Sequence, residues 1–261
     1  MNTSLILLII LFVLMMLVGG RRGIKSFFTL VFNFLILFIM LISISSGFEP
    51  IKVTIIFSVL ITIITLFYVN GINAKTVSSL ISVTIVILLT LLMTYKIGTN
   101  AKIQGFGKEQ AETIAFVSVY VKLNFTKVLL CEVLIGLLGA IIDVSISISS
   151  SLYEIYKSNP TITKQNLFLY GMNIGKDILG TMTNTLLFAY IGGFMTLIIY
   201  FNELHYSFFN IVNAKVFCSE VFQSLCGGIG IILIIPVTSF ITSEILSSKY
   251  LLKLNYIKKS Y

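Results

Sequence analysis

Long runs of apolar residues, separated by short polar segments, make up most of this chain. A helix needs roughly 20 residues to cross the hydrocarbon core of a bilayer. Backbone groups in lipid must be hydrogen-bonded within their own segment, which favours helices over irregular chain. The pattern therefore predicts an all-α, polytopic membrane bundle. We expect seven transmembrane helices, at 4–18, 27–45, 51–69, 77–95, 128–156, 179–201 and 221–246.

Turn-forming residues separate the first four of these runs. Gly19-Gly20-Arg21-Arg22-Gly23 follows the first run, Ser46-Gly47-Phe48-Glu49-Pro50 the second, and Asn70-Gly71 the third. Such Gly, Pro and Asn clusters mark turns between periodic segments. The more polar stretch Lys96–Thr126 has a middle part, Glu109–Val121, for which we expect an amphipathic helix at the membrane interface.

The composition excludes a soluble protein. The 261 residues are 57% hydrophobic and 11% charged, with a mean hydropathy of +1.03, whereas soluble domains have roughly 25% charged residues. The length leaves room for one transmembrane domain, 1–261. We therefore interpret the net charge of +8 as a sign of membrane topology, and we expect no nucleic-acid partner.

The distribution of basic residues orients the chain. Eleven lysines and arginines fall on the side of the first loop and seven on the other. Positive charge favours the cytoplasm, so we expect the N-terminus outside and the C-terminus inside a bacterial cell membrane. The basic residues on the cytoplasmic side of this scheme are Arg21, Arg22, Lys25, Lys75, Lys157, Lys164, Lys176, Lys249, Lys253, Lys258 and Lys259.

Enzymatic motifs are absent from the sequence. Cys131, Cys218 and Cys226 lie in apolar stretches without metal-ligand spacing, and His205 is the single histidine. We find no nucleophile elbow, zinc-protease motif or phosphate-binding loop. The expectation is a protein that is not an enzyme and has no cofactor and no metal site.

One face of the predicted fifth helix combines small residues with polar ones. It contains Gly136, Ala140, Asp143, Ser147, Ser150 and Glu154. Small residues let another backbone approach closely, and an intramembrane carboxylate is costly enough to indicate function. Asp143 is thus either a protonatable or ion-binding group or a neutral packing residue. We favour the first, with Ser147, Thr181 and Asn184 as its hydrogen-bonding surroundings.

The last two predicted helices add further polar and small residues. Asn173, Asp177, Thr181, Asn184 and Thr185 follow helical spacing near the start of the sixth helix. The seventh contributes Glu220, a packing pair Gly227-Gly228 and Pro236. Together with Ser150, the residues Asp177, Thr181, Asn184 and Glu220 extend the proposed proton, ion or substrate pathway. Asp177 also suits a helix N-terminus, and Glu220 suits a membrane interface.

Several of these segments resemble the YibE/YibF family of bacterial membrane proteins. The resemblance is carried by Leu138–Val144, Ser150–Ile155, Gly171–Asp177 and Gly180–Thr185, with Gly20–Gly23 and Glu220 to Thr238 also fitting. Without a large extramembrane domain, the chain is more similar to the shorter, YibF-like members. The resemblance implies a polytopic membrane protein often encoded beside a longer YibE-like partner. We expect as partner either such a YibE-like protein or further copies of this chain.

A more distant pattern is similar to the cores of SecD/SecF and resistance-nodulation-division permeases, in which an intramembrane aspartate relays protons. The matching order is Asp143, Glu154, Lys164, Asn173 and Thr181–Thr185. Similarity of fold alone does not establish transport.

Two functions therefore lead, and a third is disfavoured because no nucleophile and base can be named. The first is a secondary transporter or ion-coupled permease subunit of unknown substrate. The second is a non-transporting membrane scaffold or assembly subunit. The third, an intramembrane enzyme, has no supporting motif.

Overall fold

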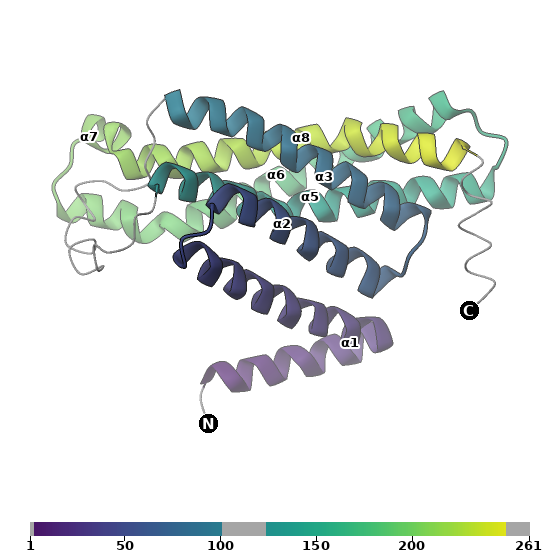
Figure 1. Cartoon of the computed structure of the whole chain (residues 1–261), viewed down its shortest axis with the longest axis horizontal. Coiled ribbons are helices and arrows are strands. Elements are labelled where there is room, and N and C mark those ends of the chain that lie inside the picture. The colour runs from purple at the N-terminus through teal and green to yellow at the C-terminus, as the bar shows by residue number, and fades with distance from the viewer. Residues whose placement is uncertain (1–2, 101–123, 249–261) are drawn as a thin grey trace.

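The structure is a computed structural model that describes residues 3–100 and 124–248. Within these ranges the chain is helical apart from short connections (Figure 1). The elements are α1 (Thr3–Ser45), α2 (Pro50–Ile63), the π-helical turn η1 (Ile64–Tyr68), α3 (Ala74–Asn100), α5 (Phe125–Ser158), α6 (Lys164–Glu203), α7 (Phe208–Asn213) and α8 (Lys215–Ser247). With α2 and η1 counted together, the described part has six helices long and apolar enough to cross a membrane. The predicted all-α membrane bundle is confirmed.

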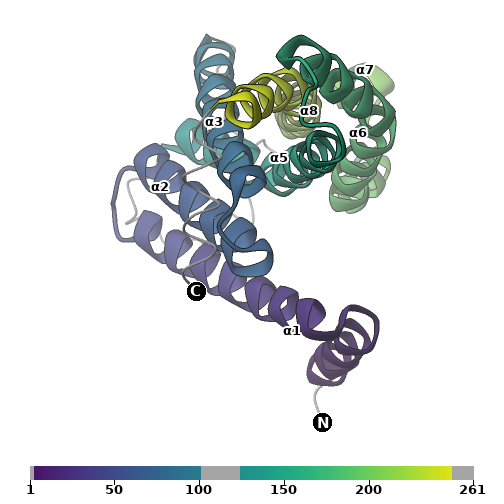
Figure 2. The same cartoon turned by 90° about the vertical axis from the view of Figure 1, so that its right-hand side faces the viewer.

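The first two predicted helices are two arms of α1. Gly20 has φ 53° and ψ −134°, outside the helical range, and the arms fold back on each other there (Figure 2). Positive φ costs glycine nothing because it lacks a Cβ. The turn is tight, since a Cβ on Gly23 would lie 1.8 Å from the carbonyl oxygen of Met15. The rings of Phe12 and Phe27 meet edge to face, 4.8 Å apart, and pack the arms together.

The other predicted helices are present, with one large difference in length. The predicted helix 179–201 corresponds to α6, which begins at Lys164 because Thr163 caps it, its side chain accepting a hydrogen bond from the backbone of Asn166. The polar entry of α6 lacks an apolar run, so hydropathy alone missed it. The short α7 was also not predicted, and the amphipathic helix expected at Glu109–Val121 lies outside the described residues.

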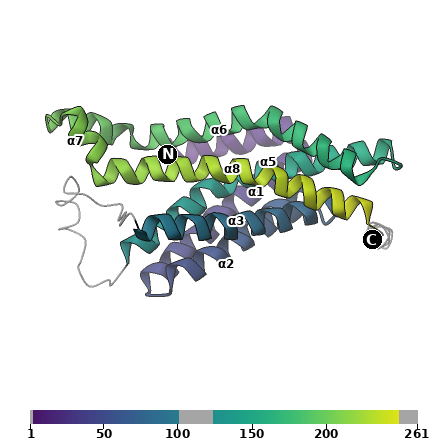
Figure 3. The same ribbon diagram turned by 90° about the horizontal axis from the view of Figure 1, so that it is seen from above.

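Helix α8 lies at the centre of the packing. It contacts α6, α5 and α3 extensively, and seen from above it runs between α6 and α3 (Figure 3). The fully buried core side chains come mostly from α5, with partners on α3 and α8. They include Val83, Val86, Ile87, Leu134, Leu137, Ile141, Ile148, Leu152, Ile231 and Ile234.

Hydroxyl side chains join α3, α5 and α8 inside this core. The Oγ atoms of Ser79 and Ser149 are 2.6 Å apart, and Thr238 donates to Ser145 Oγ at 3.1 Å. All four residues are completely buried or nearly so. Small hydroxyl residues allow close helix approach and bond across helices where lipid offers no partner. They fix the register of the three helices.

The helices alternate in direction along the bundle. In Figure 1 the turn at Gly20, the turn after η1, the α5–α6 connection and the end of α8 lie at one end, and the α1–α2 turn and α7 lie at the other. The exposed cations Arg21, Arg22 and Lys25 lie at the first end. We call it the basic end.

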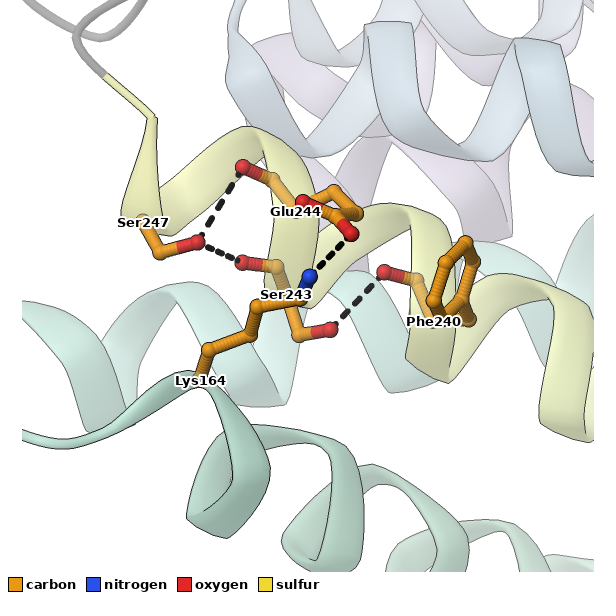
Figure 4. A network of polar contacts seen from close by, with 5 residues as sticks. All are labelled: Lys164, Phe240, Ser243, Glu244 and Ser247. Atoms are coloured by element: carbon orange, nitrogen blue, oxygen red, sulfur yellow. Dashed lines mark hydrogen bonds and ion pairs between the residues drawn. The ribbon is translucent and has the colours of Figure 1, made fainter.

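An ion pair closes the basic end between α6 and α8. The Lys164 ammonium contacts Oε1 of Glu244 (Figure 4). The same ammonium lies 5.5 Å from the centre of the Phe240 ring, a favourable cation–π distance. Ser243 and Ser247 donate to backbone carbonyls of α8 beside it. This contact anchors the polar start of α6 to the end of α8.

Candidate functional site

A groove lies between the second arm of α1, the α2–η1 segment and α5. It consists of two adjoining hollows of about 280 and 410 Å³ that share four lining residues, Asn33, Thr65, Ile142 and Asp143. Polar side chains from three elements meet there. The polar lining of the groove is Ser26, Thr29, Asn33, Thr65, Asn70 and Asp143. Most of the remaining wall is aliphatic.

Asp143 brings the one carboxyl group into this lining. It lies near the middle of α5, 18 residues after Phe125 and 15 before Ser158, and its side chain is exposed to the groove. The carboxyl forms no hydrogen bond or ion pair with any residue that the structure describes. A bare carboxylate at this depth costs several kcal/mol, about 2.5–3.5 or more, so it requires a proton, a cation or water.

Asn33 of α1 lines the same groove, and its side-chain oxygen has no hydrogen-bond partner among the described residues. Its Nδ2 donates to Thr65 Oγ1 at 2.8 Å, while its Oδ1 is buried and has no hydrogen-bond partner. Buried polar atoms are normally paired. A neutral Asp143 has an O–H to donate, and carboxylate, amide and hydroxyl oxygens, the polar atoms of this lining, are of the types that bind hard cations.

The wall carrying Thr65 is π-helical. The segment η1 interrupts the α-helical pattern at Ile64–Tyr68, and single π turns inside helices often occur at functional sites. The chain then turns at Asn70-Gly71, where Gly71 has φ 72°. Asn73 and Thr76 cap α3 reciprocally, each accepting from the backbone N–H of the other. This cap fixes the wall of the groove at the basic end.

The three residues predicted to hydrogen-bond the Asp143 carboxyl form no hydrogen bond with it in the structure. Ser147 donates to the backbone carbonyl of Asp143 at 2.7 Å, and the Thr181 hydroxyl donates to the carbonyl of Ile178. Asn184 is exposed on α6 and has no hydrogen bond with a described residue. Thr181 and Asn184 do not reach Asp143 because its side chain points towards α1 and η1, whereas theirs point away from the core.

The remaining predicted pathway residues are dispersed. Asp177 is exposed on α6, 13 residues after Lys164, so the expectation that it lies at a helix N-terminus is wrong. Ser150 is half-buried on α5. Glu220 is half-buried on α8. These positions form no single cluster with Asp143.

The predicted packing glycines lie between helices of this same chain. A Cβ on Gly136 would lie 2.4 Å from the Tyr190 hydroxyl, and a Cβ on Gly227 would lie 2.6 Å from Leu186. Gly228 faces Thr183 at 4.0 Å. Ala140 is half-buried and packs against the core. The glycines allow α6 to pack closely against α5 and α8.

The described residues contain no group of three or more His, Cys, Asp and Glu placed to bind a metal ion. The three cysteines are free thiols, Cys131 and Cys226 buried and Cys218 exposed. Cys218 Sγ contacts the carbonyl of Val212 at 3.2 Å.

Sequence reasoning missed Asn33 and Thr65. Asn33 is a lone amide inside the apolar run 27–45, flanked by Phe32 and Phe34. An amide in a spanning helix needs a partner, and this argument would have identified Asn33. Thr65 carried no comparable signal, since threonine is common in such helices and can bond its own backbone.

The family model described as "YibE/F-like protein" matches residues 7–248 of this chain. The match covers all of the helices that form the groove. No curated protein and no solved structure matches the chain.

Proposed function

We propose that this chain, which belongs to the YibE/F-like family, is an ion-coupled membrane permease or the energy-coupling subunit of one. Its coupling site is the groove around Asp143. The observation that carries the proposal is the Asp143 carboxyl, which has no partner among the described residues and lines a groove that Asn33, with its unpaired buried Oδ1, also lines. Two polar groups without hydrogen-bond partners inside the membrane lower the stability of the fold unless a ligand binds to them.

The proposed ligand is a proton or Na⁺. We propose that a neutral Asp143 donates its O–H to Asn33 Oδ1 and so draws α1 against α5. When it is ionised, the carboxylate needs a cation or water, which favours a wider groove. Binding and release of the ion thus move α1 relative to α5. This movement would couple the ion site to a substrate site in this chain or in a partner subunit.

The α1 hairpin is suited to such a shift. The first arm of α1 has no buried residue in its most apolar window, and the second arm contacts mainly α2 and η1. Movement here leaves the α3–α5–α8 core undisturbed.

An ion-flux assay with purified protein in liposomes tests this function. Liposomes loaded with a pH-sensitive dye receive a K⁺ diffusion potential, and a parallel set receives radioactive Na⁺. We expect wild-type protein to pass one of the two ions. Asp143→Asn keeps the shape but cannot exchange a proton or carry the charge, so its flux should fall to that of protein-free liposomes.

The matched control is Glu154→Gln, the same chemical change on the same helix at an exposed position. It should keep wild-type flux, and both variants should elute like the wild type in detergent. Equal flux through wild type and Asp143→Asn, or no flux of either ion through the wild type, contradicts the proposal.

The finer resemblances belong to the same proposal. We place the chain with the shorter, YibF-like members, acting beside a YibE-like partner, and we extend the SecD/SecF-like proton relay to Asp143. The orientation in this proposal has the basic end in the cytoplasm, with the N-terminus outside.

The alternative is a non-transporting scaffold for a membrane partner. It is favoured by α6, whose most apolar window is only 11% buried within this chain. The flux assay separates the two, because a scaffold passes no ion in either assay.

A further inference from the structure

Helix α6 faces the rest of the molecule with one side only. Gly171 and Gly175 pack against Ser239 and Ile235 of α8. Further along, Leu186 and Tyr190 pack against Gly227. The opposite side is exposed, at positions spaced four, three, four, three and four residues apart. We call this the α6 outer seam: Asn173, Asp177, Gly180, Asn184, Leu187 and Ile191.

The centre of the outer seam contains an amide. Asn184 lies in the middle of α6, 20 residues after Lys164 and 19 before Glu203. It is exposed and has no hydrogen bond with a described residue. Lipid tails offer no donor or acceptor, so a polar side chain in a spanning helix normally faces protein. The centre of the seam is therefore expected to face another protein helix rather than lipid.

Small and apolar residues complete the seam around this amide. A Cβ on Gly180 would meet nothing within 4 Å, which leaves room for another backbone. Leu187 and Ile191 are exposed by 40% and 38%. The alternating four-and-three spacing is the contact pattern of two helices crossing at roughly 20° in a left-handed sense.

We propose that the α6 outer seam binds the same seam of a second copy of this chain, about a two-fold axis along the membrane normal. A two-fold axis places each seam residue near its own counterpart. The asparagine amide both donates and accepts, so two Asn184 side chains satisfy each other. This self-complementarity favours a second copy over an unrelated helix.

Charge at the edge of the seam agrees with a second copy. Lys176 and Asp177 are both exposed, and successive helix residues are about 100° apart, so they lie on opposite edges of the seam. A two-fold axis brings one edge of the first helix against the other edge of the second. Lys176 of each copy then faces Asp177 of the other, at equal depth.

Disulfide cross-linking tests this arrangement. In a background with Cys131→Ala, Cys218→Ser and Cys226→Ala, one set of vesicles contains Ile191→Cys, at the seam. The matched control contains Thr185→Cys, which is exposed on α6 but turned by about 100° from Asn184. Mild oxidation should give covalent dimers for Ile191→Cys and monomers for Thr185→Cys.

A charge exchange supplies the second measurement, made by counting subunits in sparse vesicles. Lys176→Asp and Asp177→Lys should each lower the dimer fraction, and the double exchange should restore it. Asn184→Leu should lower it without loss of folding, because Asn184 is exposed in the single chain.

Equal cross-linking at both cysteines, or a monomer in vesicles whatever the variant, overturns the proposal. A monomer would mean that a different chain covers the seam. This outcome is independent of the ion flux, since the Asp143 groove lies on α1, η1 and α5.

Discussion

Glycines in this protein differ sharply in what surrounds them. A Cβ on Gly175 would lie 2.2 Å from Cγ2 of Ile235 and 3.1 Å from its Cβ. Rotation of the isoleucine side chain can move Cγ2 but not Cβ, so a close contact would remain. A Cβ on Gly192, on the same helix, would meet nothing within 4 Å. Packing therefore requires glycine at position 175. Nothing that the structure describes requires it at position 192.

Gly175→Leu should destabilise the protein by about 1–3 kcal/mol, the usual cost of inserting side-chain volume into a packed contact. The physical reason is the forced separation of α6 from α8. Unfolding in detergent, followed by circular dichroism, measures the change. Gly192→Leu is the control and should be near neutral, and equal losses for both variants would falsify the packing explanation.

At the scale of single residues, the sequence draws attention to Asp143 but does not tell which side chains surround it. Asp143 stands out from sequence because a carboxylate inside an apolar run is costly. Its neighbours do not, since helical periodicity tells which residues share a face but not which helix that face meets. Asn33 of α1, rather than Asn184 of α6, lines the groove with Asp143, and only the three-dimensional packing decides between them.

At the scale of elements, the α1–α2 turn is attached to α5 through one carboxylate. Glu49 contacts Lys52 at 3.0 Å and Lys127, at the start of α5, at 3.4 Å. Lys52, together with Lys127, holds the pKa of the Glu49 carboxyl below its ordinary value. This carboxylate joins the helices of the groove at the end opposite to the basic end.

The pH dependence of this contact follows from the direction of the shift. A carboxyl whose folded-state pKa is lowered adds stability above its unfolded pKa and loses it as the pH falls through the folded value. Glu49→Gln should therefore melt at a slightly lower temperature than the wild type at neutral pH. The difference should disappear in acid. Melting curves of both proteins across the acidic range check this, and a constant difference would contradict it.

Element boundaries were predictable where an apolar run ends in a turn signal. The run 51–69 ends as α2–η1 at Asn70-Gly71, as expected. The start of α6 was not, because Lys164–Ile178 mixes polar with apolar residues and has no continuous apolar run. The Thr163 cap and the Lys164–Glu244 ion pair stabilise it as helix. Long-range contacts of this kind leave no trace in hydropathy.

At the scale of the whole molecule, the alternation of helices gives a testable topology. Asn159 lies in the α5–α6 connection at the basic end, and His205 lies between α6 and α7 at the other (Figure 1). Lysines and arginines near helix ends favour the cytoplasm. A reporter inserted at Asn159 should be cytoplasmic and one at His205 extracytoplasmic. Both reporters on one side would exclude a membrane-spanning α6.

The fold-back of α1 at Gly20 has a consequence for biogenesis. Arg21 and Arg22 directly follow the turn, and moving such guanidinium groups through hydrocarbon is unfavourable. A tight pair of antiparallel arms avoids this, because both arms can enter the bilayer side by side while the turn stays on the side of synthesis. The first two crossings would then be inserted as a single unit, before any residue of the central core has left the ribosome.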